Sequence, residues 1–241
     1  MRRRTRRSGG GAPDEARAAA WRQSMSVGIA TGAYGVSFGA LSVTSGLSVA
    51  QTCVLSLLLF SGGSQFAVAG VAGAGGSGAA AMATAALLGV RNGLYGLQLG
   101  PILAVRGVRR VVAAQLTIDE STAVGTAQLA AHPGRPELAR LGFWVTGTAV
   151  FVGWNAMTLV GAVVGDALGD PRRFGLDAAA AAAFLALLWP RLRDAGTRRV
   201  AAAAALVAVG TVPVAPAGVP VLLAGGVALG LGVLELRRAG P

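Results

Sequence analysis

The sequence is poor in charge and nearly devoid of the residues that build disulfides and metal clusters. Only 13% of its 241 residues are charged, about half the share found in an ordinary soluble domain. Its single cysteine, Cys53, and single histidine, His132, exclude a disulfide framework and a Cys/His metal cluster. We therefore expect no metal ion, and no motif in the sequence calls for a cofactor.

Lysine is absent, so all 21 basic residues are arginine, and the net charge is +11. Without lysine, no G-x-x-x-x-G-K-[ST] nucleotide-binding loop is possible. A strongly basic chain usually indicates nucleic acid, but these arginines lie in an N-terminal tail and mostly between long apolar segments. With 54% hydrophobic residues and a mean hydropathy of +0.62, the chain is predicted to be an integral membrane protein that binds no nucleic acid.

The first 23 residues are predicted to differ in kind from the rest. Seven of them are arginine, and residues 1–23 are expected to be a disordered cytoplasmic tail that contacts anionic lipid headgroups and fixes orientation. A targeting or nucleic-acid-binding arm is the alternative. Residues 24–236 are expected to form a single transmembrane domain.

Eight apolar segments approach the length of about 20 residues that a spanning helix needs. The sixth and seventh are short, so seven spans is the alternative. Eight spans with the N-terminus in the cytoplasm place most loop arginines inside, but the loop 106–110 then carries Arg106, Arg109 and Arg110 outside. The segments are 24–46, 50–72, 78–105, 111–131, 141–165, 176–190, 199–213 and 218–236.

Polar residues recur near the middle of the first five segments. A charge at the bilayer centre costs about 2.5–3.5 kcal/mol on insertion scales, so these residues must face one another or a wet cavity. Helical spacing puts Arg91 on one face with Tyr95, and Asp119 on one face with Gln115 and Thr122. The mid-depth residues are Tyr34, Ser61–Gln65, Arg91, Asp119, Glu120 and Asn155.

Each of these groups has a functional and a structural interpretation. Arg91 and Asp119 bind a substrate, or they form an ion pair that only locks two helices. Glu120 points about 100° away from Asp119, among apolar neighbours that favour its neutral form, and is a candidate for reversible protonation. The run Ser61, Gly62, Gly63, Ser64 and Gln65 either interrupts a helix, freeing amides for a ligand, or packs helices closely through small residues.

Four motifs in this order carry a family resemblance: S-G-G-S-Q-F at 61–66, R-N-G-L-Y-G at 91–96, I-D-E at 118–120 and W-N-A-M-T-L-V-G at 154–161. The chain resembles the AzlC (YgaZ-type) permease family over roughly residues 24–195. The resemblance implies the large subunit of a branched-chain amino acid exporter that acts with a small hydrophobic AzlD (YgaH-type) membrane subunit. Many members have Thr-Asp-Glu where this chain has Ile118 inserted between Thr117 and Asp119.

The sequence therefore predicts an all-α polytopic bundle of seven to eight spans, some broken at the midplane, in a bacterial plasma membrane. It is predicted to be no enzyme but a secondary, proton-coupled exporter of small neutral amino acids. Arg91 is expected to bind the substrate carboxylate and Asp119 its ammonium, Glu120 to carry a proton, and Ser61–Gln65, Tyr34 and Asn155 to line the site. A channel or a non-transporting scaffold subunit is the alternative.

Overall fold

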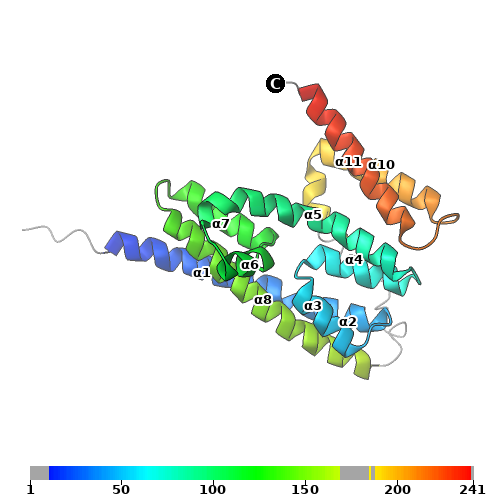
Figure 1. Ribbon diagram of the computed structural model, residues 1–241, viewed down its shortest axis with the longest axis horizontal. Coiled ribbons are helices and arrows are strands. Elements are labelled where there is room, and N and C mark those ends of the chain that lie inside the picture. The colour runs from blue at the N-terminus through cyan, green and yellow to red at the C-terminus, as the bar shows by residue number, and fades with distance from the viewer. Residues whose placement is uncertain (1–10, 169–184, 186–187, 240–241) are drawn as a thin grey trace, which may run out of the picture. The chain divides into compact units, whose positions relative to one another are not determined.

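The computed structural model describes residues 11–168, 185 and 188–239, and every regular element within them is a helix, as Figure 1 shows. The predicted all-α class is confirmed for this part of the chain. Two compact units can be distinguished: unit 1 comprises Met1–Tyr34 and Arg91–Asn155, and unit 2 comprises Gly35–Val90 and Ala156–Pro241. That residues 24–236 act as one transmembrane domain stays a prediction.

Two stretches among the described residues are long and apolar enough to cross a membrane. One is Glu15–Thr44, which contains most of α1 (Gly11–Ala33) and all of α2 (Gly35–Thr44). The other is α8 (Pro136–Ala167). Helix α5 (Gly78–Leu103) has 26 residues, about 39 Å at 1.5 Å per residue, and is long enough to cross as well. Arg91 and Asn92 in its middle lower its hydropathy.

Helix α1 begins at Gly11, so residues 11–23 are helical where disorder was expected. The reason is compositional: after Pro13, which is favoured in a first turn, the segment 14–23 contains mainly Ala, Arg, Glu and Gln, which are strong helix formers. Residues 1–10 lie outside the described residues.

In unit 2, α3 (Val49–Leu58) and α4 (Gly62–Gly73) form a helical hairpin. Thr52 of α3 donates to Ser42 of α2 across a short loop, so α3 runs antiparallel to α2. The rings of Phe38 and Phe66 pack at 5.6 Å, and Gly73 lies against Ser45, so α4 runs parallel to α2. The two arms are therefore antiparallel to each other (Figure 1).

In unit 1, α6 (Val108–Gln115) and α7 (Asp119–Ala131) form a second hairpin. Helix α7 runs antiparallel to α8, because Gly142 lies against Gln128 and Gly147 against Ser121. Helix α6 runs parallel to α8. Its end at Leu116 lies against Gly147, and its start follows Ile102, whose carbonyl accepts a 2.8 Å hydrogen bond from Arg140.

These hairpins correct two of the predicted spans. Segments 50–72 and 111–131 are not continuous helices: the first breaks at 59–61 and the second at 116–118. The interruption predicted near Ser61 is present, whereas the one before Asp119 was not anticipated.

Segment 176–190 falls mostly outside the described residues. Segments 199–213 and 218–236 correspond to α10 (Ala195–Thr211) and α11 (Val219–Ala239), which pack on each other after the short 3-10 helix η3 (Trp189–Arg193).

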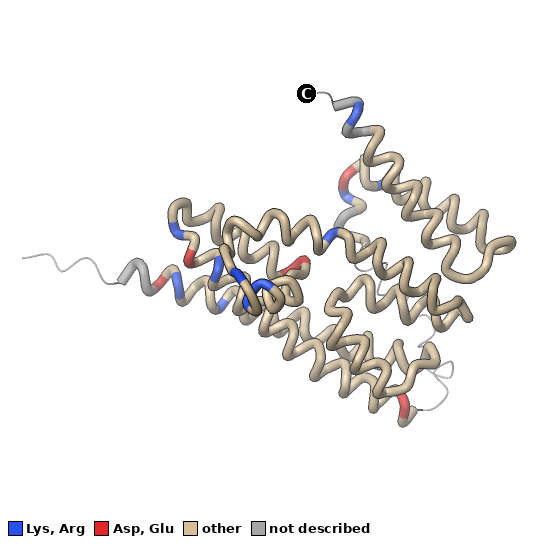
Figure 2. The backbone as a smooth tube through the Cα atoms, viewed as in Figure 1, with Lys and Arg blue, Asp and Glu red and all other residues tan. Residues whose placement is uncertain are grey.

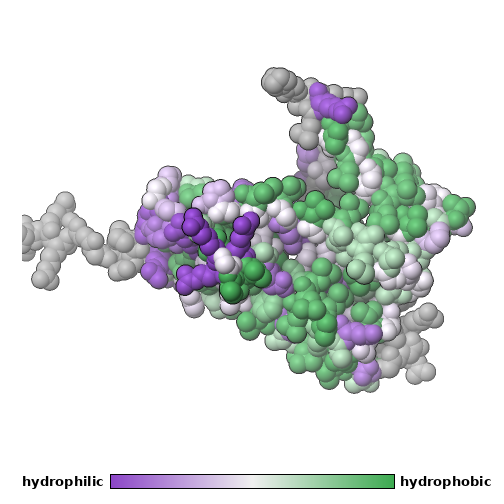
Figure 3. Space-filling model, in the orientation of Figure 1, coloured by the Kyte–Doolittle hydropathy of each residue, from purple (hydrophilic) through white to green (hydrophobic). Residues whose placement is uncertain are grey.

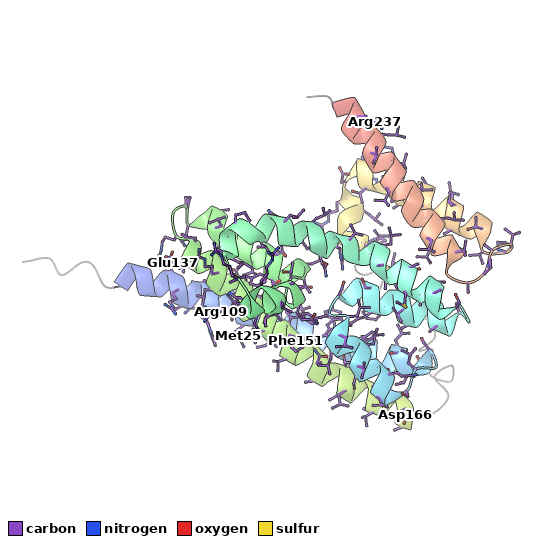
Figure 4. The ribbon with its side chains drawn as sticks, in the orientation of Figure 1. Met25, Arg109, Glu137, Phe151, Asp166 and Arg237 are labelled. Carbon is purple, nitrogen blue, oxygen red and sulfur yellow. The ribbon has the colours of Figure 1, made fainter. Side chains whose placement is uncertain are left out.

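One end of unit 1 is rich in arginine. Gln128 at the end of α7 donates to Gln23 of α1, and Ser24 lies beside Gly142, so the start of α1 reaches the level of the α7–α8 turn. Figure 2 shows blue arginine segments here on α1, α6 and α8, and Figure 3 shows the same part in purple. Figure 4 labels Arg109 in the first turn of α6 and Glu137 at the start of α8. The arginines of this end are Arg17, Arg22, Arg106, Arg109, Arg110, Arg135 and Arg140.

Glycine seams let α8 approach its neighbours closely. In unit 1, Gly28 and Gly32 of α1 face Ala149 and Gly153 of α8. In unit 2, Gly161 faces the backbone of Val36, and other small residues continue the contact. Such small-xxx-small spacing allows helix backbones to touch in a membrane, where dispersion replaces the hydrophobic effect as the driving force.

We expect Gly161→Ala to destabilise the protein, because a Cβ there would overlap the carbonyl oxygen of Val36. Overpacking of this kind typically costs about 1–3 kcal/mol. The matched control is Gly230→Ala on α11, where a Cβ meets open space and helix propensity favours alanine. Thermal unfolding of both detergent-purified variants tests this: Gly161→Ala should melt lower than wild type and Gly230→Ala should not. Equal melting temperatures for Gly161→Ala and the wild type would show that α8 and α2 are not closely packed at Gly161.

Candidate functional site

The candidate site is an ion pair between α5 and α7 in unit 1. Arg91 Nη1 lies 3.0 Å from Asp119 Oδ2, and the Tyr95 hydroxyl donates to Asp119 Oδ1 at 2.7 Å. Arg91 and Tyr95 are one turn apart, so both reach the same carboxylate. The two charged side chains are 30% and 33% exposed. Solvent therefore screens the pair, and it contributes less to stability than a fully buried pair.

Asp119 is placed by the break that precedes it. Thr117 donates to the carbonyl of Ala113 at 2.7 Å, and Ser121 donates to that of Leu116 at 2.6 Å. The amide of Ile118 donates in turn to the Ser121 hydroxyl. Side-chain hydroxyls thus satisfy backbone groups that the interruption frees. Helix α7 starts at Asp119, where the positive end of the helix dipole stabilises a carboxylate.

Several buried polar atoms near this pair have no hydrogen-bond partner among the described residues. Arg91 uses Nη1 for Asp119, but its Nε is buried and unpaired. The neighbouring residue Asn92 has an unpaired carbonyl oxygen, and Thr122, one turn after Asp119, has an unpaired hydroxyl. A buried polar atom without a partner costs about 1–3 kcal/mol. The site therefore has unused capacity for a polar ligand or for water.

Glu120 occupies the first turn of α7 beside Asp119 and is half-buried. Among the described residues it takes part in no ion pair, and the partner of Arg91 is Asp119. The two adjacent carboxylates therefore differ in that Asp119 is held in an ion pair and Glu120 is not. Their separate roles stay predictions.

The Ser61–Gln65 run is in unit 2 and is largely engaged with its own hairpin. Gln65 donates to the carbonyls of Leu59 and Ser56 at the end of α3, and Ser64 donates to Ala85 of α5 at 2.9 Å. These bonds hold the two arms of the hairpin and attach it to α5. Ser61 is buried with an unpaired hydroxyl, and Gly62 and Gly63 open α4.

Tyr34 and Asn155, the other two residues predicted to line the substrate site, make no hydrogen bond to the ion pair among the described residues. Tyr34 occupies the turn between α1 and α2 and is 67% exposed. The Asn155 amide donates to Phe151 one turn earlier on α8, and its carbonyl oxygen is unpaired. Within the described part of the chain, no hydrogen bond joins either residue to Arg91 or Asp119. Their assignment to the substrate site stays a prediction.

Sequence reasoning missed three members of this site. Tyr95 was predicted on the face of Arg91 but given no role, although its i+4 spacing from an intramembrane arginine was a usable signal. Thr122, also predicted on the face of Asp119 but given no role, has i+3 spacing from Asp119, and Asn92 is adjacent to Arg91 in the sequence. The described residues contain no group of three His, Cys, Asp or Glu side chains that could hold a metal ion.

Comparison with known proteins gives one match. Residues 26–168, more than half of the chain, match the family model described as AzlC protein. No curated protein and no solved structure matches. The matched range contains α2 to α8 and therefore both hairpins and the Arg91–Asp119 pair.

Proposed function

The chain belongs to the AzlC family, and from that membership we propose that it exports branched-chain amino acids across a bacterial plasma membrane. The family is one of membrane-associated transport proteins linked to branched-chain amino acids, rather than of enzymes, and its members generally work with partners. The direction of transport, the driving ion and the partner belong to the proposal.

The Arg91–Asp119 pair is the observation that supports this proposal most directly. An amino acid at neutral pH is a zwitterion, so its site needs a cation, an anion and an apolar surface. Arg91 retains an unpaired Nε–H donor on a guanidinium group that suits a carboxylate, and Asp119 is an anion that can accept an ammonium. When the substrate binds, each of its charges replaces part of the existing ion pair, so neither protein charge is left unpaired.

We assign proton coupling to Glu120. Glu120 is next to Asp119, the residue proposed to bind the substrate ammonium, but it forms no ion pair with Arg91. A proton can therefore bind to Glu120 without breaking the Arg91–Asp119 pair. A channel is the alternative function, because a polar path through a helical bundle also conducts without coupling. The two differ in whether a proton gradient drives accumulation.

The hairpins also change the side of the membrane to which the loop 106–110 is assigned, compared with the eight continuous spans predicted from the sequence. Because α6 and α7 return to the side from which they start, the loop 106–110 is assigned to the same side as residues 132–140 and the start of α1. The arginines that violated the positive-inside rule then lie in the cytoplasm with the N-terminus. The chain is proposed to cross the bilayer several times, with the two hairpins as re-entrant elements.

We propose that a small AzlD-type subunit docks on unit 2. A groove of about 530 Å³ runs along α3 and is almost wholly apolar; it is lined by Leu47, Ala50, Gln51, Val54, Leu55, Leu58, Leu59 and Val68. Leu58 is 74% exposed and Val54 is 53% exposed. An amphipathic or apolar helix of a partner fits a groove of this chemistry.

Transport in proteoliposomes tests the function and the partner together. We expect the two subunits reconstituted together to accumulate labelled leucine in response to an imposed proton gradient, and this chain alone to accumulate little. Val54→Trp, which fills the groove, should abolish co-purification of the small subunit, whereas Val209→Trp on the exposed face of α10 should not. Full activity of the single chain contradicts the partner proposal, and downhill flux that never accumulates against a gradient identifies a channel.

A further inference from the structure

A second groove lies in unit 1, between α1 and the first part of α8. It has a volume of about 570 Å³ and is lined by Arg17, Ala18, Trp21, Arg22, Leu141 and Val145. Arg17 and Trp21 are one turn apart on α1, and Leu141 and Val145 are one turn apart on α8. The groove therefore combines two guanidinium groups, one amphipathic ring and an aliphatic wall.

The two arginines are available for an external anion. Both side chains are exposed, and neither takes part in an ion pair within the described part of the chain. Glu15, the nearest described carboxylate on α1, does not pair with them. The groove also lies at the arginine-rich end of unit 1, because Ser24 is beside Gly142.

We propose that this groove binds one anionic phospholipid. Its phosphate is held by Arg17 and Arg22, whose guanidinium groups match phosphate oxygens in charge and geometry. Trp21, 49% exposed, lies at the glycerol level, where indole rings collect at membrane interfaces. An acyl chain then covers Leu141 and Val145, which removes apolar surface from water at the headgroup boundary.

Only an amphiphile uses both parts of the groove. A free phosphate ion would use the arginines and leave the aliphatic wall uncovered. A partner helix would cover the wall without needing the two arginines. An anionic phospholipid satisfies both, and cytoplasmic leaflets rich in anionic lipid attract basic side chains by about 1 kcal/mol each, or about fivefold in affinity. The inference is independent of the transported substrate.

Lipid binding by the purified full-length chain tests the proposal. The probes are phosphatidylglycerol and phosphatidylcholine with identical acyl chains, titrated in detergent and measured by native mass spectrometry. We expect wild type to prefer phosphatidylglycerol, and Arg17→Gln/Arg22→Gln to lower that affinity about 25-fold, about fivefold for each arginine. Arg17→Lys/Arg22→Lys should recover part of the binding, because it restores the two positive charges but not the planar donors; a folding defect would not be rescued in this way.

The matched control is Arg109→Gln/Arg110→Gln, which removes two arginines from the same end of unit 1 but outside the groove. We expect it to change phosphatidylglycerol binding less than about twofold; an equal loss in both variants would mean a general surface charge effect and overturn the site. Soluble glycerol phosphate should compete poorly, and equal competition would leave the aliphatic wall without a role. If Arg17→Gln/Arg22→Gln binds lipid normally but loses the small subunit, the groove is a protein interface instead.

Discussion

Asp119→Asn is expected to abolish export, whereas Glu120→Gln is expected to preserve exchange and lose accumulation against a gradient. Asp119 accepts from both Arg91 and Tyr95, so the amide removes the anion that balances the arginine and receives the substrate ammonium. A hydrogen bond to a charged group contributes about 1.5–3 kcal/mol, and Asp119→Asn weakens the bonds both to Arg91 and to the substrate ammonium. We therefore expect export by Asp119→Asn to fall at least about tenfold at every external pH.

Glu120→Gln fixes this side chain in a form that resembles the protonated carboxyl. Arg91 keeps its partner Asp119, so the substrate still binds and exchanges. Without a proton to take up and release, transport loses its link to the proton gradient, and it should become insensitive to external pH. Labelled-leucine counterflow measures exchange, and gradient-driven uptake measures accumulation. If Asp119→Asn is instead the exchange-competent, pH-insensitive variant, the two carboxylates have the opposite roles.

A swapped pair separates a substrate site from a purely structural lock. In Arg91→Asp/Asp119→Arg the two charges remain opposite each other between α5 and α7, so a helix lock is restored. The substrate, however, now meets each charge at the wrong position, and Tyr95 loses its acceptor on α7. We expect well-folded protein by thermal unfolding and no export. Export by Arg91→Asp/Asp119→Arg near the wild-type level would mean that the pair only holds α5 and α7 together and does not bind the substrate.

The Arg91–Asp119 pair was predictable from the sequence because the cost of an isolated intramembrane charge leaves few arrangements. Arg91 and Asp119 carry opposite charges in neighbouring apolar segments, so they must either pair with each other or reach water. Each also has polar residues at helical spacing on its own segment. The same reasoning failed for Gln115, which was placed on the face of Asp119. Gln115 ends α6 and Asp119 starts α7, so the two residues do not share a helix.

The hairpins could not be read from periodicity or length. Arms of 8 to 13 residues on either side of a short break add up to about the length of one spanning helix. Gly62 and Gly63 indicated the first break, although the helix had already ended at Leu58. The second break, at Leu116, Thr117 and Ile118, contains neither glycine nor proline. It is stabilised by hydroxyl bonds from Thr117 and Ser121, which depend on tertiary geometry.

The same plan occurs in both units. In unit 2, α2 is followed by a hairpin whose second arm runs parallel to it, and then by the first half of α5. In unit 1, the second half of α5 is followed by a hairpin whose second arm, α7, also runs parallel to it, and then by α8. Residues 35–90 and 91–155 therefore repeat one arrangement of helices, and internal structural repeats of this kind are common among secondary transporters.

Cysteine accessibility should place the loop 106–110 in the cytoplasm and the loop 74–77 outside. Continuous spans at 50–72 and 111–131 assign the opposite sides to both loops. In the proposed topology both hairpins are re-entrant, so each loop returns to the side from which its hairpin starts, and α5, about 39 Å long, is proposed to cross from one side to the other. Cys53, the only native cysteine, is first replaced by alanine, and Ala74→Cys or Val108→Cys is then added at an exposed position.

A membrane-impermeant maleimide applied to intact cells should label Ala74→Cys and leave Val108→Cys unlabelled until the cells are opened. Pro133→Cys, in the turn before α8, is the matched control for orientation, since both topologies assign it to the cytoplasm when the N-terminus is inside. Labelling of Val108→Cys but not Ala74→Cys, with Pro133→Cys protected, would restore the continuous spans. Labelling of both Val108→Cys and Pro133→Cys from outside would keep the hairpin, because the two loops stay together, and would invert the orientation of the whole chain. The labelling of these three cysteines therefore tests both whether α6 and α7 form a re-entrant hairpin and on which side of the membrane that hairpin opens.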